Sequence, residues 1–269
     1  MKFYFLQKIE QRNSYIAAFI VLAIILLTTT STIRDALARV VWEEFKMAPV
    51  AGFLNIHDAN LALELGNYYF NEGAYDLALA EKYFEDALAN DPNSPIAWHQ
   101  LARIAFLKGQ FSSALLRINR QIELHGDTYM ASFYVRGLIH GYAGNLDGAA
   151  RDFAFFLEKK PDSWAANNDL AWIYFRKGDF KKVEEAAREG LKYHPENPWL
   201  LTSLGVALLN LDKKIEARKT LEAAKAAADT LTVADWGKAY PGNNPESYSA
   251  GLTKMKATIE FNLKLASSR

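Results

Sequence analysis

One small residue returns along most of the chain at an almost constant interval. It occurs as Ala80, Ala114, Ala149, Val183 and Ala217, and by subtraction the intervals are 34, 35, 34 and 34 residues. Self-similarity at a fixed period of this length is the signature of repeat architectures, in which each repeat is one supersecondary unit. Because one unit cannot bury its own apolar face, the period predicts an elongated stack of units.

Other positions repeat with the same period. A second small residue, where two helices can approach closely, is Gly66, Ala102, Gly137, Ala171 and Gly205. Turn signals such as Gly178-Asp179 stand between the two positions. Prolines such as Pro161, which cannot continue a helix, close several units. The repeated pattern therefore predicts two helices joined by a turn in each unit.

These residues resemble the tetratricopeptide repeat (TPR) family, whose unit of about 34 residues has the signature W-x2-L-G-x2-Y…A-x3-F…P. The first unit carries it as Leu65-Gly66, Tyr69, Ala80 and Phe84. The resemblance covers residues 59–231, in units at 59–94, 95–129, 130–163, 164–197 and 198–231. It implies an all-α fold, a right-handed α-solenoid of about five helix pairs.

Residues 232–269 are expected to form a connector and a C-terminal capping helix. The stretch from Asp235 to Asn244 contains Gly237, Pro241 and Gly242, which predicts an irregular connector. Asn244-Pro245-Glu246 then has the cap, proline and acid of a helix start. Since the end units of a repeat array need a cap, this helix is expected to cover the fifth unit.

Residues 14–33 are predicted to form one transmembrane helix. No charged residue lies between Arg12 and Arg34, and a membrane-spanning helix needs about 20 apolar residues. The strictly apolar part is short, so a cleaved signal peptide is an alternative, as is a buried soluble helix. Residues 1–13 are a short tail, and basic residues flank the span almost equally. The short tail favours a cytoplasmic N-terminus, with the TPR domain on the extracytoplasmic side.

Residues 34–58 are expected to be a juxtamembrane helix and a connector. Apolar residues recur at helical spacing up to Phe45, and Trp42 and Phe45 suit a lipid interface. Pro49 and Gly52 are expected to end this helix, which makes residues 47–58 a connector. Dimerisation through the apolar stripe is an alternative.

Composition and motifs argue against several functions. The 31 basic and 31 acidic residues give no net charge, so no broad attraction to nucleic acid is expected. The chain has no cysteine, and its five histidines form no metal-ligand pair at helical spacing. No P-loop, GxGxxG or GxSxG motif occurs. We therefore expect no enzyme activity, no cofactor and no metal.

The resemblance implies a binding surface. In this family the first helices of the pairs line a concave groove that receives an extended peptide or a partner helix. Some of these rings could equally be core between repeats. The corresponding positions here are Asn67, Phe70, His99, Arg103, Phe106, Tyr134, Leu138, Tyr142, Asn168, Trp172, Phe175, Arg176, Trp199 and Thr202.

One subgroup of the family grips the C-terminal carboxylate of its ligand with lysine and asparagine at fixed inward positions. Here those positions hold Leu63, Asn67, Ala131 and Val135, so that ligand is not expected. The favoured function is a membrane-anchored scaffold or adaptor that binds a protein or peptide partner in assembly of a cell-envelope complex. The alternative is a structural component that self-associates and leaves the groove idle.

Overall fold

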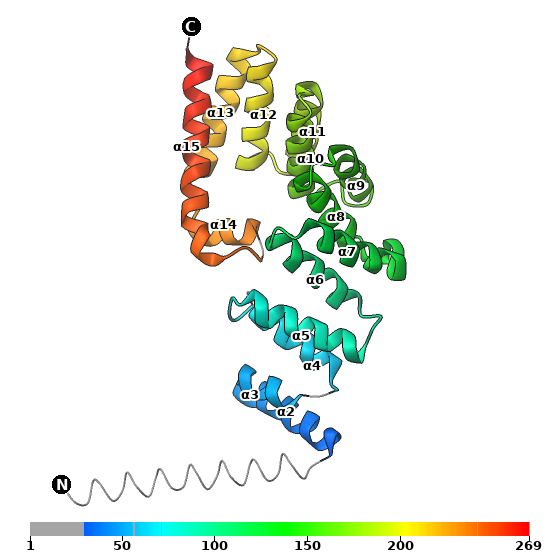
Figure 1. The fold of residues 1–269 in the computed structure, drawn as a ribbon. Helices are drawn as coiled ribbons and strands as arrows, with labels where there is room; N and C mark the ends of the chain where they lie inside the picture. Colours follow the sequence, from blue (N-terminus) through cyan, green and yellow to red (C-terminus); the bar gives the residue numbers. More distant parts are fainter. Residues whose placement is uncertain (1–29, 56, 71, 241, 269) are drawn as a thin grey trace, which may run out of the picture.

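The computed structural model describes residues 30–55, 57–70, 72–240 and 242–268. Over these residues the chain forms fourteen α-helices and two short 3-10 helices. Successive helices turn back on one another and stack along a curved axis, from α2 at one end to the end of α15 at the other (Figure 1). The predicted all-helical solenoid is confirmed.

Each expected repeat unit holds one pair of helices. The helices end close to the predicted unit boundaries, and η1 (Gly126–Tyr129) fills the boundary between the second and third units. The pairs are α4 (Ala59–Tyr69) with α5 (Leu77–Asn90), α6 (Pro95–Leu107) with α7 (Phe111–His125), α8 (Ala131–Tyr142) with α9 (Leu146–Lys159), α10 (Trp164–Arg176) with α11 (Phe180–Tyr193), and α12 (Pro198–Asn210) with α13 (Lys214–Asp229).

Short polar side chains fix where these helices begin. Ser163, for example, accepts a hydrogen bond from the amide of Ala166 at the start of α10. Such caps satisfy a backbone donor that the first helical turn leaves unpaired. The same kind of cap is formed by Asp58, Asp76, Ser94, Asn145, Asp179 and Asn197.

The two helices of a pair touch through the second small residue of the period. A Cβ atom added at Gly66 would lie 2.6 Å from the ring of Phe84, and one at Gly137 would lie 2.9 Å from the ring of Phe153. Both rings are fully buried, so neither can move aside. At these two positions only a residue without a side chain permits the distance. Ala102 and Ala171 at the equivalent positions of two other units are fully buried, so the period selects small residues there.

The apolar core is a series of clusters along the stack. One joins α2 through α6, and further clusters join α6 to α8, α8 to α12, and α11 through α13 to α15. Each pair therefore covers the apolar face of the next, as expected for a repeat array.

The N-terminal part differs from the prediction. The first described helix, α2 (Ser31–Phe45), is followed at once by α3 (Ala48–Leu54), so the expected connector over 47–58 is largely helical. Pro49 lies in the first turn of α3, where proline has no helical hydrogen bond to lose. Trp42 is also not at a lipid interface, because it is buried and its Nε1 donates to Glu64 at 2.6 Å.

The predicted transmembrane helix at 14–33 falls almost entirely on residues 1–29, outside those described. Within the described part of the chain, no helix is both long and apolar enough to cross a membrane.

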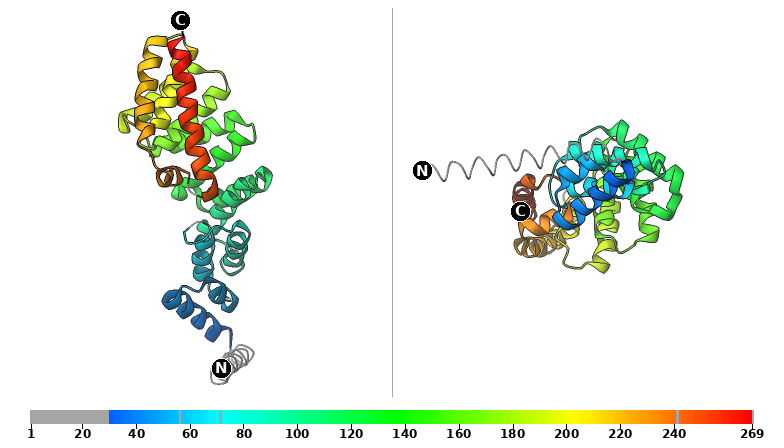
Figure 2. Two further views of the ribbon diagram at one scale, coloured as in Figure 1. Left: turned by 90° about the vertical axis from the view of Figure 1, so that its left-hand side faces the viewer. Right: turned by 90° about the horizontal axis from the view of Figure 1, so that it is seen from below.

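The C-terminal part also corrects the prediction. The irregular connector expected from Asp235 to Asn244 overlaps α14 (Val233–Ala239), which begins with a capping box between Thr232 and Asp235. After η2 (Pro245–Ser247), α15 (Tyr248–Ser267) runs back along α13 (Figure 2). The glycines of this stretch favoured the prediction of a loop. The capping box nevertheless starts a helix of about two turns, although the stretch has no apolar stripe.

Removing a ring from the contact between paired helices should destabilise the stack. We expect Phe153→Ala to lower the free energy of unfolding by about 3–5 kcal/mol, because it leaves a cavity beside Gly137. Phe261→Ala on α15, where the ring is 61% exposed, is the matched control and should change it little. Urea denaturation followed by circular dichroism measures both, and equal effects would contradict this account of the core.

Candidate functional site

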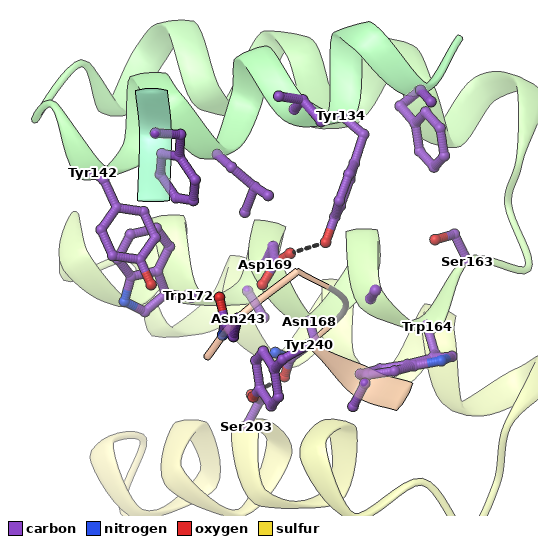
Figure 3. Close-up of a pocket in the computed structure, with 18 of the residues that line it drawn as sticks. Tyr134, Tyr142, Ser163, Trp164, Asn168, Asp169, Trp172, Ser203, Tyr240 and Asn243 are labelled. Carbon is purple, nitrogen blue, oxygen red and sulfur yellow. Dashed lines mark hydrogen bonds between the residues drawn. The ribbon is translucent and has the colours of Figure 1, made fainter. Parts of the chain in front are cut away.

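The concave side of the stack holds a cavity of about 870 Å³. Its walls come from α6, α8, α10 and α12, and its remaining side is closed by α14 and the residues after it (Figure 3). We name α14 together with Tyr240, Gly242 and Asn243 the C-terminal strap. The strap reaches as far as the first repeat, since a Cβ on Gly242 would lie 2.9 Å from Arg103 and 3.1 Å from Phe70.

Most of the predicted groove residues meet in this cavity. Four of the predicted residues do not line it, namely Asn67, Phe70, Arg176 and Trp199. Those that do are His99, Arg103, Phe106, Tyr134, Leu138, Tyr142, Asn168, Trp172, Phe175 and Thr202.

Three of these exceptions, Asn67, Phe70 and Arg176, have partners within the fold. Asn67 accepts a hydrogen bond from Gln100 at 3.0 Å, and Phe70 is buried. Arg176 donates to the carbonyl of Gly141 at 2.7 Å. Phe70 therefore belongs to the packed core of the first repeats.

His99 and Arg103 line the cavity but are also held by the protein. His99 is buried, and its Nδ1 lies 3.1 Å from the hydroxyl of Ser132. Burial, with the charge of Arg103, lowers the pKa of His99 to about 3, so the ring is neutral at pH 7. Arg103 lies 4.8 Å from the ring of Phe70 and donates to Gln100 at 2.7 Å. Both side chains therefore stabilise the wall of the cavity through contacts within the protein.

Three aromatic side chains form the rim of the cavity. Tyr142 is 56% exposed and Phe175 is 45% exposed, although both are large apolar side chains. The rings of Tyr142 and Trp172 pack together with centroids 5.0 Å apart, and the guanidinium of Arg176 lies 5.3 Å from the ring of Trp172. Exposed rings held by their neighbours can bind a partner with little loss of conformational entropy.

The strap closes the other end through stacked aromatic rings. Trp199 lies 5.0 Å from Trp164 and 6.0 Å from Trp236, measured between ring centroids. Its Nε1 also donates to the hydroxyl of Tyr240 at 2.9 Å. Burial raises the pKa of Tyr240 to about 12, so this hydroxyl stays protonated. Trp199 thus fixes the strap to the last repeat through these contacts.

A carboxylate that the sequence analysis missed lies in the cavity. The hydroxyl of Tyr134 donates to Asp169 Oδ2 at 2.6 Å (Figure 3). Burial raises the pKa of Asp169 to about 6, although hydrogen bonds from Tyr134 and Asn168 oppose the shift. Asn168 in turn accepts from Ser203 at 2.9 Å. These side chains connect α8, α10 and α12 across the floor of the cavity.

Helical spacing could have identified Asp169. It follows Ala165 by four residues and precedes Trp172 by three, and all three line the cavity. Tyr240 and Asn243 could not have been found in this way. They follow the last repeat, and only the folding of the strap onto the concave side brings them into the cavity.

The arrangement of apolar walls with a few polar groups is suited to binding. Over the described residues, no group of three or more His, Asp or Glu side chains could hold a metal ion. The pair His99 and Ser132 resembles part of a hydrolytic site, but Ser132 is fully buried in α8, where no substrate can reach it.

The charge on Asp169 should reduce stability at neutral pH. Its pKa of about 6 in the fold exceeds the ordinary 3.8, so between these values the folded state holds a proton that the unfolded state has lost. Stability from this group therefore rises as pH falls from about 6 to about 4. We expect Asp169→Asn to be about 1–3 kcal/mol more stable than the original chain at pH 7, with no difference below pH 4.

Urea denaturation of both proteins at pH 7 and pH 4 measures this difference. The comparison cancels the opposite effect of His99, whose lowered pKa disfavours the fold as pH falls below about 6.5 in both proteins. A difference that does not depend on pH would show that Asp169 is not desolvated.

Comparison with known proteins agrees with the repeat fold. Two family profiles, each described as a tetratricopeptide repeat, match residues 69–134 and 134–182. The Hsp70-Hsp90 organising protein of Plasmodium falciparum is 36% identical over 120 residues, which are 45% of this chain and 46% of that protein. The chain spans less than half the length of the curated relatives that it matches.

Solved structures share the fold at low sequence identity. The type IV pilus biogenesis factor PilW is 18% identical with a TM-score of 0.58, over 78% of this chain and 98% of PilW. YrrB, described as a TPR protein with an unusual peptide-binding site, is 15% identical with a TM-score of 0.54, over 68% of this chain and 93% of YrrB. Residues 69–182 of this chain are therefore tetratricopeptide repeats, and they belong to an all-helical TPR solenoid.

Proposed function

We propose that this chain is a membrane-anchored TPR scaffold that binds a segment of a protein partner in its concave groove. The observation that carries the proposal is the cavity of about 870 Å³ with the exposed rings of Tyr142 and Phe175 at its rim. A concave, mostly apolar site with a few polar groups is the usual form of a binding site.

The comparisons support a binding role. YrrB, with the same fold, is described as having a peptide-binding site, and the organising protein is named for two chaperones. A carboxylate-gripping site of the chaperone-binding kind is not part of the proposal, because Leu63 and Val135 stand where polar or cationic residues would be needed. We infer an internal segment of the partner as the ligand.

The membrane anchor is the second part of the proposal. The uncharged stretch from residue 13 to 33 supports it, since its length matches the hydrocarbon core. The neighbouring helices α2 and α3 expose Ile33, Phe45 and Phe53, which are 53%, 67% and 68% exposed. Exposed apolar side chains next to an anchor fit a position at the membrane surface. PilW supports a role in assembly at the cell envelope, because it is a pilus biogenesis factor.

Mutation of the rim tests the groove. We expect Tyr142→Ala with Phe175→Ala to reduce partner recovery at least about tenfold after crosslinking in native membranes, because both rings are exposed anchors. Leu116→Ala removes a side chain that is 73% exposed on α7 and should leave recovery unchanged. Circular dichroism checks that each variant stays folded.

Two outcomes would contradict the groove. Equal recovery with the rim variant would place the partner elsewhere on the chain. Recovery of only the chain itself would favour the alternative, a structural component that self-associates.

A fusion of alkaline phosphatase to the C-terminus tests the anchor, because this reporter becomes active only outside the cytoplasm. We expect an active fusion that stays in the membrane fraction after alkaline carbonate washing. Deleting residues 14–33 should make the reporter inactive and soluble. An inactive reporter on the full chain would reverse the proposed topology, and an active reporter released by the wash would indicate a cleaved signal peptide.

A further inference from the structure

The cavity floor carries a carboxylate that the fold does not pair with a cation. Asp169 is held by the hydroxyl of Tyr134 and by the amide of Asn168, which are both neutral. None of the ion pairs formed by the described residues includes Asp169. A carboxylate has about four acceptor positions, so these two hydrogen bonds leave others directed at the cavity.

Asp152 is a comparable carboxylate at another position in the fold. It is buried, whereas Asp169 is partly exposed at the cavity, and Arg136 donates to both oxygens of Asp152, at 2.9 and 2.7 Å. A desolvated charge is costly unless it is paired and hydrogen-bonded. Asp169 has no cationic partner of this kind among the described residues. A cation that entered the cavity could therefore form an ion pair with it.

The cations near the cavity are committed to other contacts. Arg103 interacts with Gln100 and Phe70, and Arg176 donates to the carbonyl of Gly141. Lys238 is 79% exposed at its side chain and lies 3.5 Å from Asp235 on its own helix. These contacts leave the position beside Asp169 to a group from outside the chain.

Aromatic rings surround this position. The negative charge of Asp169 acts on the hydroxyls of Tyr134, Tyr142 and Tyr240, which come from α8 and the strap. Trp172 lies beside Tyr142 on the same side of the cavity (Figure 3). The faces of such rings attract cations, most strongly in a desolvated site. A planar guanidinium can stack on a ring and also bind a carboxylate through two hydrogen bonds.

We propose that Asp169 and the aromatic residues around it form a pocket for a basic side chain, preferably arginine, of the bound partner. This inference rests on the proposed function, because it names the chemistry by which the groove recognises a segment. The exposed rim at Tyr142 gives the side chain its path from solvent, and the partner backbone remains outside along the groove.

The test uses N-acetyl-arginine amide and N-acetyl-citrulline amide, which have the same shape but differ in charge. We expect the full-length protein in detergent to bind the arginine compound at least about tenfold more tightly in a calorimetric titration. Asp169→Asn should weaken arginine binding about 30-fold and remove the discrimination, because it deletes one partner of a desolvated charge pair. Asp152→Asn, at a carboxylate already paired within the fold, should keep the discrimination.

Equal binding of the two compounds, or discrimination that survives Asp169→Asn, would overturn the pocket. Heptapeptide libraries with one position fixed as arginine, citrulline or leucine separate this result from failure of the groove. If Tyr142→Ala abolishes peptide binding but the bound peptides show no preference for arginine, the groove is supported and the pocket is rejected. If the arginine compound binds but no peptide is selected from the libraries, the groove is rejected. A side chain of a bound partner is then rejected as the occupant of the pocket.

Discussion

The close contact between the two helices of each pair is the constraint on which the rest of this structure depends. At Gly66 and Gly137 the missing side chain lets one helix lie directly against a buried phenylalanine of the next. Helices paired in this way recur in five units, which stack along one curved axis (Figure 1). The concave side, and therefore the binding surface, is a consequence of repeating one local contact.

The C-terminal strap changes what that surface can do. A simple array would leave its concave side open from end to end, but here α14 is fixed by stacking on Trp199, and Gly242 lies against Phe70 and Arg103. The strap closes one side of the groove into a cavity and contributes Tyr240 and Asn243 to its wall. Recognition is thus concentrated at the rim formed by Tyr142 and Phe175 and in the space behind it.

The cavity behind the rim contains a carboxylate, although the net charge of the chain is zero. The charges of the chain are balanced overall, yet Asp169 lies among aromatic rings without a cationic partner in the described structure. The cost of such a group to folding is the usual mark of a functional position. Removing the charge of Asp169 would then raise the stability of the fold at neutral pH and lower its affinity for a basic group.

The sequence by itself determined the helix pairs, their order and most of the concave residues. It could do so because the period and the turns are local signals, with the small residue recurring five times as Ala80, Ala114 and their equivalents. Only the tertiary structure decided that Phe70, His99 and Trp199 serve the fold, that the connector after residue 232 is a helical strap, and that Asp169 faces a cavity. These outcomes depend on contacts between residues far apart in the chain, such as Gly242 with Phe70, and no local period encodes them.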